Sequence, residues 1–272
     1  MKERSTAVRL FQLGVHLWLL GFLLSALPAM GDLWLHPISP VLRPPGPFTA
    51  LTHALGSWLP QVAVLPGVAI AIVLCLRGLF RPARWWSAAV LWFIFVNLMH
   101  TAWMAGSGGQ QLMANLLFWN ILLSLPLTSL LTEWLSTLAL WVIRGQLLLA
   151  YAVTGLHKLT GEQWTDGTAL GIVVTDPAFG PAWIATMPVL AVALTYSVLL
   201  FQLTFPFAVW WRRTRVPWML FGIAFHLGTA LWMDIPEMGL AFLVAYASWL
   251  DEKEAGWFLT MRHKVLRTSS PG

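Results

Sequence analysis

The sequence is poor in charge. Asp, Glu, Lys and Arg together make up only 10 % of its 272 residues, whereas soluble domains carry about 25 %. This shortage excludes a soluble globular protein. Hydrophobic residue types make up 58 % of the chain, and several apolar runs reach the roughly 18 to 25 residues that cross a bilayer. We therefore predict a polytopic membrane protein, with no long polar segment left over for a soluble domain.

Cysteine is almost absent, since Cys75 is the single cysteine of the chain. An internal disulfide is therefore excluded. A metal site is not expected either. His100 and His226 lie within apolar runs, but no carboxylate or second cysteine accompanies them as zinc sites require.

The apolar runs predict an all-α bundle of about eight transmembrane helices. We expect them at residues 10–29, 60–76, 85–105, 111–131, 134–157, 183–211, 217–233 and 238–250. Residues 1–250 then form one transmembrane domain, and residues 251–272 form a short cytoplasmic tail. Five prolines between the first two spans exclude a regular helix there.

The basic residues predict the orientation. Most of the 16 lysines and arginines lie at the N-terminus, in the loops after the second and sixth spans, and in the tail. Basic loops face the cytoplasm, so both termini are expected there and the segment after the fifth span, with Lys158, faces outward. Short clusters between spans are typical of membrane topology and not of a nucleic-acid surface. The lipid bilayer is therefore the first expected partner.

A polar stripe runs along the fifth predicted span. Arg144, Tyr151 and Lys158 are seven positions apart, and each step drifts by only about 20° around the helix. Gly155 lies beside them. Intramembrane charges usually face a bundle interior or a cavity, so this stripe is expected to line a cavity. Trp164, Glu162 and Asp166 follow shortly after it.

Polar residues on neighbouring spans are further candidates to line that cavity. Asn97 and His100 are three positions apart on the third span, and His226 is near the middle of the seventh. For each, the alternative is a helix-to-helix hydrogen bond, worth about 0.6 kcal/mol on average. A histidine at mid-membrane is also a plausible proton carrier.

The stretch "LLLAYAVTGLHKLTGEQWTDGTAL" resembles the HTTM (horizontally transferred transmembrane domain) family, which includes the membrane region of vitamin K-dependent gamma-carboxylases. The resembling residues are Arg144, Gln146, Tyr151, Gly155, Lys158, Trp164 and Gly167. A weaker likeness follows in a Phe–Pro segment (Phe205, Pro206), a basic turn and a histidine in the next span (His226). The resemblance extends over nearly the whole chain.

The resemblance implies a lyase-like chemistry that uses reduced vitamin K, a menaquinol-like naphthoquinone, together with oxygen. Lys158 occupies the position of the carboxylase lysine regarded as the base, and His157 replaces a neighbouring lysine. With His226 these are the expected catalytic residues. The expected cofactor- or substrate-binding residues are Arg144, Tyr151, Gly155, Trp164, Asp166, His100 and Asn97. The resemblance also favours a bacterial inner membrane as the location.

One departure from the carboxylases concerns the substrate. Those enzymes carry a large extra-membrane domain after the spans, whereas this chain continues for only about twenty residues. A separate protein or peptide substrate is therefore expected. Two alternatives stay open. One is a non-enzymatic lipid- or quinone-binding membrane module, or a partner-dependent maturation factor. In the other, Lys158 only snorkels to the membrane surface and Trp164 belongs to the aromatic belt.

Overall fold

The computed structural model describes residues 5–36 and 61–257. It is all-α, as the sequence predicted: the described residues are 83 % helical and contain no strand. The chain forms two compact units. The first consists of Met1–Trp141 together with Leu250–Gly272, and the second is Val142–Trp249. Pro60, where the second span was expected to begin, lies outside the described residues.

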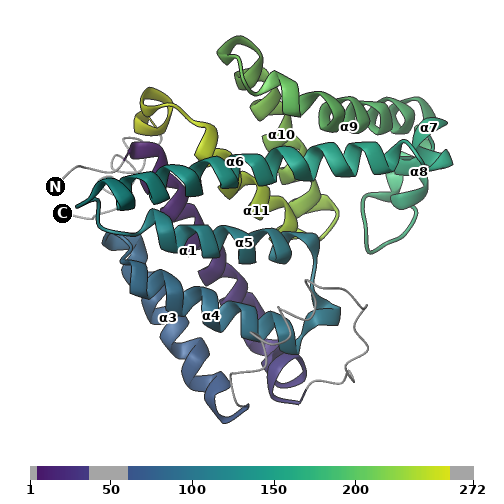
Figure 1. The fold of residues 1–272 in the computed structure, drawn as a ribbon. Helices are drawn as coiled ribbons and strands as arrows, with labels where there is room; N and C mark the ends of the chain where they lie inside the picture. Colours follow the sequence, from purple (N-terminus) through teal and green to yellow (C-terminus); the bar gives the residue numbers. More distant parts are fainter. Residues whose placement is uncertain (1–4, 37–60, 258–272) are drawn as a thin grey trace, which may run out of the picture. The chain divides into compact units, whose positions relative to one another are not determined.

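The first unit packs four helices against one another (Figure 1). Its elements are α1 (Thr6–Ala26), η1 (Leu27–Ala29), η2 (Gly31–Leu35), η3 (Gln61–Ala63), α3 (Val64–Phe80), α4 (Trp85–Thr101), η4 (Trp103–Ala105) and α5 (Gly108–Leu123). Helix α1 contacts α3 and α5, and α4 contacts α3 and α5. The first half of α6 (Leu130–Lys158) also belongs to this unit.

A buried amide connects α1 to the end of α5. Gln12 donates to the side-chain oxygens of Asn120, at 3.2 Å, and Ser124, at 2.9 Å. All three residues are at most 5 % exposed. Buried polar groups in a membrane bundle are stable only when they find such partners, so this contact specifies which faces of α1 and α5 meet.

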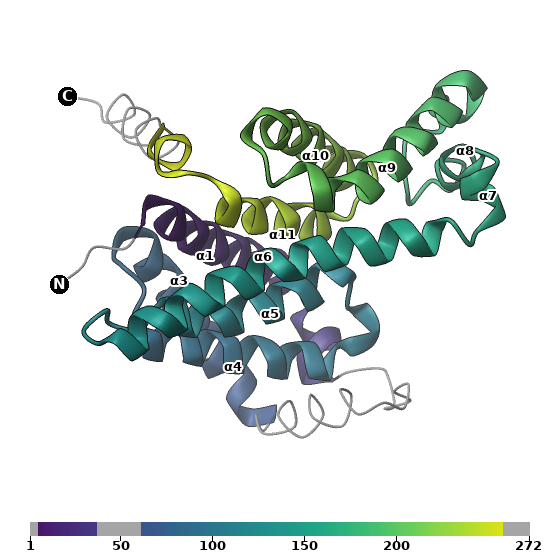
Figure 2. The same cartoon turned by 45° about the horizontal axis from the view of Figure 1, so that its top comes forward.

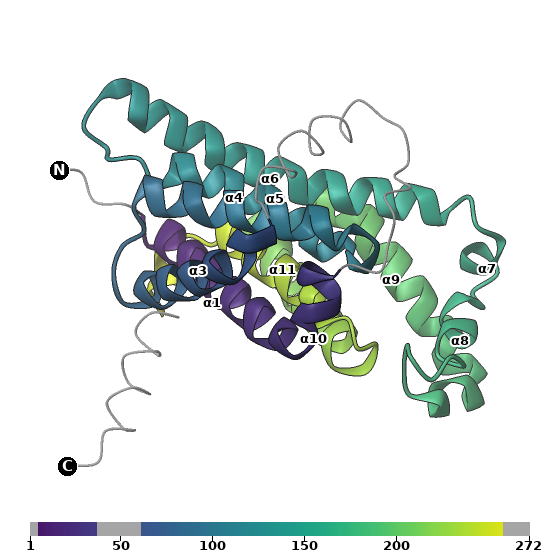
Figure 3. The same cartoon turned by 90° about the horizontal axis from the view of Figure 1, so that it is seen from below.

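The second unit begins in the middle of α6. Its further elements are α7 (Glu162–Thr165), α8 (Ala169–Val173), η5 (Ala182–Thr186), α9 (Pro188–Ala208), α10 (Arg212–Trp232), α11 (Pro236–Tyr246) and η6 (Ala247–Trp249). The short helices α7 and α8 lie at the C-terminal end of α6 (Figures 2 and 3). Helix α10 packs on α11 and α9, and α8 packs on α9. Pro188 and Pro236 open α9 and α11 at positions that need no helical N–H.

Within the described residues, three helical segments are long and apolar enough to cross a membrane. They are Thr6–Ala29, Leu130–Lys158 and Pro188–Ala208. Val64–Phe80 and Trp85–Thr101 are shorter apolar helices. The other expected spans and the cytoplasmic location of both termini therefore remain predictions.

Several helix boundaries differ from the expected spans, and two of the differences have a local cause. Helix α5 ends at Leu123, short of the expected residue 131. Pro126 follows closely and cannot continue the helical hydrogen bonds. Helix α10 begins at Arg212, five residues before the expected start, with Pro217 inside its second turn. The basic turn is thus part of the helix, because arginine is a good helix former.

Candidate functional site

Three polar rings meet inside the second unit, one from each of α6, α10 and α11. The hydroxyl of Tyr151 lies 2.5 Å from Nε2 of His226 and 2.6 Å from the hydroxyl of Tyr246. Each of the three residues is at most 3 % exposed. The sequence predicted Tyr151 and His226 as site residues, and the fold brings them into direct contact.

An aromatic cage surrounds this polar trio of Tyr151, His226 and Tyr246. Phe201 and Phe205 of α9 lie 5.2 and 4.5 Å from the ring of Tyr151, centroid to centroid. Phe242 stacks on the imidazole of His226 at 4.5 Å. Since hydrogen bonds are stronger where water is excluded, the cage makes these contacts costly to break.

The trio has only two arrangements of its protons. Tyr151 has a single O–H, so it donates to one neighbour and accepts from the other. Either Tyr246 donates to Tyr151 and Tyr151 to His226, or the order is reversed. Nδ1 of His226 has no hydrogen-bond partner among the described residues. The three groups therefore form one directed chain of hydrogen bonds.

Arg144 lies two turns before Tyr151 on α6 and contacts η6, which directly follows α11. Its Nε donates to the carbonyl oxygen of Ser248 at 2.8 Å. Its guanidinium carbon lies 5.4 Å from the ring centroid of Trp249. The side chain is half-buried and faces protein at these two contacts. A backbone carbonyl is one of the groups that can pair with an intramembrane arginine.

Lys158 ends α6 and contacts Trp164 of α7. Its ammonium nitrogen lies 4.7 Å from the centroid of the indole ring, which is within cation–π range. Both side chains are half-buried. Two predicted site residues thus form a pair at the C-terminal end of α6, where the chain turns into α7.

The acidic neighbours of Lys158 are not bonded to it. Asp166 accepts from the backbone N–H of Thr168 at 2.8 Å and from its hydroxyl at 2.6 Å. These two hydrogen bonds hold the pKa of the Asp166 carboxyl below its usual value. Glu162 opens α7 and is exposed. Within the described residues, neither carboxylate forms an ion pair with Lys158.

The loop that carries Asp166 is fastened to α9. The hydroxyl of Tyr196 donates to the carbonyl oxygen of Thr165 at 2.9 Å. Gly167 has a φ of +85° and packs against Tyr196, so a Cβ there would be both strained and 3.0 Å from that ring. Deeper along α6, Gly155 packs against Gln202 and Leu203 of α9.

The remaining predicted residues lie elsewhere. His157 is exposed, and its backbone carbonyl accepts from the hydroxyl of Thr160. Asn97 and His100 belong to α4 in the first unit. The amide of Asn97 donates to the carbonyl oxygen of Phe93 at 2.8 Å. The described residues contain no group of three or more His, Cys, Asp or Glu side chains that could hold a metal ion.

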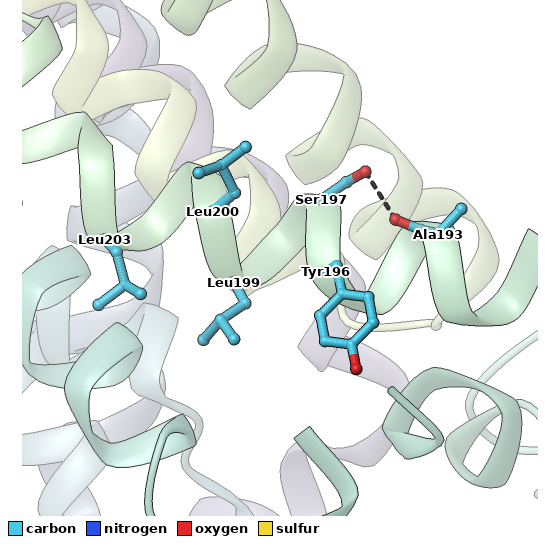
Figure 4. Close-up of a pocket in the computed structure, with 6 residues that line it drawn as sticks. All are labelled: Ala193, Tyr196, Ser197, Leu199, Leu200 and Leu203. Carbon is cyan, nitrogen blue, oxygen red and sulfur yellow. Dashed lines mark hydrogen bonds between the residues drawn. The ribbon is translucent and has the colours of Figure 1, made fainter. Parts of the chain in front are cut away.

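A shallow groove of about 420 Å³ runs along one face of α9 (Figure 4). Six residues line it, from Ala193 through Tyr196, Ser197, Leu199 and Leu200 to Leu203. Sequence reasoning missed this groove, because its residues are ordinary for a membrane span.

Tyr246 is the second feature that sequence reasoning missed. The chain has only three tyrosines, and two of them, Tyr151 and Tyr246, meet in the trio. A buried tyrosine hydroxyl usually needs a partner, so this scarcity was a usable signal. The third, Tyr196, holds the loop beside Lys158.

The comparisons agree with this membrane architecture. Residues 61–250 match the family model of the HTTM domain, which is more than half of the chain. No curated protein and no solved structure matches the sequence. The matched region contains α6 with its polar stripe, the polar trio and the pair of Lys158 and Trp164. The chain belongs to the HTTM family and, with its long apolar helices, is an integral membrane protein.

Proposed function

We propose that this protein is a quinone-dependent membrane enzyme in which Lys158 acts as the base. The observation that carries the proposal is the contact of Lys158 with the flat ring of Trp164 at 4.7 Å. At this contact the proposed base lies beside a flat surface on which a planar aromatic ligand can stack. Within the described residues neither nearby carboxylate pairs with the lysine, and Asp166 is bonded to Thr168.

The residues at the end of α6 fit a reduced naphthoquinone. Such a ligand needs a flat apolar contact, a base for its phenolic O–H and an apolar path for its tail. Trp164 supplies the first and Lys158 the second. The groove on α9, where Leu203 packs against Gly155 of α6, is lined mainly by hydrocarbon. When bound, the reduced quinone would supply the electrons that reduce oxygen.

The step assigned to Lys158 is a proton transfer. Its neutral amine accepts the proton of a phenolic O–H at Nζ, which leaves an ammonium and a phenolate. The contact with Trp164 opposes this step, because the ring stabilises the charged form by about 0.5–1 kcal/mol at an exposed site. A ligand stacked on Trp164 displaces the ammonium from the ring. Ligand binding therefore favours the amine that the step requires.

The polar trio is proposed to hold or move a proton within α6, α10 and α11. Its directed hydrogen bonds connect two phenols and an imidazole, which are groups able to pass a proton along such a chain. The role proposed for Arg144 differs from the cofactor or substrate binding that the sequence led us to expect. Its contacts with Ser248 and Trp249 support a positioning role for η6.

The proposal is tested by oxygen consumption and epoxide formation. The purified protein in lipid nanodiscs is supplied with reduced naphthoquinones, with and without a polyprenyl tail. Lys158→Arg keeps the charge but removes the amine that is proposed to accept the proton, so turnover should fall by at least about 100-fold. The matched control is Lys253→Arg, since Lys253 is exposed and lies in the first unit.

Two results would overturn the proposal. One is a wild-type protein that consumes no oxygen and forms no epoxide with any of the quinols. The other is a Lys158→Arg protein as active as the Lys253→Arg control, because the charge alone would then be sufficient.

A further inference from the structure

The groove on α9 suits a hydrocarbon chain. Leu199, Leu200 and Leu203 supply most of its lining. Its two hydroxyls already have acceptors, because Ser197 donates to the carbonyl oxygen of Ala193 at 2.7 Å and Tyr196 donates to Thr165. Figure 4 shows the Ser197 contact on the turn that it closes. No charged residue lines the groove, so a polar occupant would leave its own groups unsatisfied.

The two ends of the groove locate it relative to Lys158. At one end, Leu203 packs against Gly155, one helical turn before Lys158 on α6. Toward the other, Tyr196 is bonded to Thr165, the residue after Trp164. Three residues of α-helix rise by about 4.5 Å, so Lys158 and Trp164 lie at the level of the groove.

A cation beside an apolar groove selects an amphiphile with a negative head group. Helix α9 is one of the three helices able to cross the membrane, and Leu200 and Tyr196 are 59 % and 43 % exposed on it. The molecules that meet such a face are the lipids of the bilayer. A lysine near the membrane surface attracts anionic head groups, and a tryptophan at the same level sits well among them.

We propose that this groove binds one acyl chain of an anionic phospholipid whose phosphate contacts Lys158. The chain lies along Leu200 and Leu203, and the head group lies at the level of Tyr196 and Trp164. The site shares Lys158 with the proposed function but does not depend on catalysis. Where the enzyme reaction occurs, the lipid competes with the quinol for the lysine.

Photolabelling in nanodiscs tests this site. Two probes carry the same diazirine acyl chain, one on phosphatidylglycerol and one on phosphatidylcholine, and the labelled peptides are mapped by mass spectrometry. The phosphatidylglycerol probe should label residues 193–203 roughly fivefold more than the phosphatidylcholine probe, which is the preference expected from one lysine near a membrane surface.

Three variants distinguish the contribution of the lipid head group from that of the acyl chain. Lys158→Gln should reduce the ratio between the two probes to about one while labelling continues. Leu200→Trp fills the groove and should abolish labelling by both probes. Val189→Trp is the matched control, because Val189 is 83 % exposed on the same helix and lies outside the groove. The Val189→Trp protein should be labelled to the same extent as the wild type.

Equal labelling by the two probes in the wild type overturns the proposal, as does a label that lies outside residues 193–203. Displacement of the probe by a polyprenyl quinol, but not by excess unlabelled phosphatidylglycerol, also overturns it and assigns the groove to the quinol tail. Loss of oxygen consumption does not affect these readouts, so the two proposals fail separately.

Discussion

The hydroxyl of Tyr151 lies 2.5 Å from Nε2 of His226, and this contact joins two residues that are 75 positions apart. It connects α6 to α10, and the second contact of Tyr151, with Tyr246, connects α6 to α11. One phenol thus holds three helices of the second unit together. Because the site is nearly dry, each lost hydrogen bond leaves a buried polar group without a partner.

The trio should show unequal costs when its members are truncated. Tyr151→Phe removes both hydrogen bonds and should lower the free energy of unfolding by about 2 kcal/mol, whereas Tyr246→Phe removes one and should cost about 1 kcal/mol. The measurement is thermal or denaturant unfolding of the detergent-solubilised protein. The double variant should cost less than the sum of the two, because the residues share one contact. Additive costs would contradict a shared network.

Gly222 should not tolerate a side chain. A Cβ at this position would collide with the hydroxyl of Tyr246, so Gly222→Ala must shift that ring away from Tyr151. We expect a loss of about 1–3 kcal/mol in the free energy of unfolding. Gly145→Ala is the control, since nothing lies within 4 Å of its Cβ position. The control should gain up to about 1 kcal/mol from helix propensity. A Gly222→Ala protein as stable as this control would show that the close packing is absent.

Arg144 should resist replacement by lysine. Lysine keeps the charge but has neither the Nε donor that bonds Ser248 nor the planar group that faces Trp249. Arg144→Lys should cost about 1–3 kcal/mol in unfolding experiments. Arg213→Lys, at an exposed position of α10, should be close to neutral. Equal stability of the two variants would argue against the positioning role.

The carboxylate of Glu252 should make stability depend on pH. Both of its oxygens accept from the N–H of Thr6, at 3.0 and 3.1 Å, and so cap the start of α1. Hydrogen bonds from Thr6 hold the pKa of Glu252 below its usual value of 4.5. A lowered carboxyl pKa stabilises the folded state above the unfolded value, and the gain disappears as the pH falls through the folded pKa.

Glu252→Gln should therefore lower the melting temperature at pH 7 and have little effect well below pH 4.5. Melting curves of both proteins across this range provide the measurement, with Lys253→Gln as the exposed neighbouring control. A difference that stays constant with pH would mean that the charge of the carboxylate does not contribute.

The helices were predictable because their signals are local. Apolar runs placed α1, α6 and α9 within a few residues of their observed positions. Seven-residue spacing put Arg144 and Tyr151 on one stripe that was expected to line a cavity, and both side chains contact protein. The contact of Lys158 with Trp164 spans only six positions, so a short turn suffices to bring them together.

The contacts between distant helices were not predictable in the same way. Ser248 lies 104 positions from Arg144, and Tyr246 lies 95 positions from Tyr151. Asn97 and His100 belong to the first unit, and their place beside the stripe stays a prediction. Nothing in an apolar span specifies which of several similar spans it will meet.

The sequence by itself determined that this protein is helical and lies in a membrane, because length, apolar content and scarcity of charge act within each segment. Tertiary structure alone decided that Tyr151 meets His226 and Tyr246, that Arg144 bonds Ser248, and that a groove opens on α9. Apolar packing is non-directional and is satisfied by many helix pairings. Hydrogen bonds are directional, so their partners are defined only once the helices have packed.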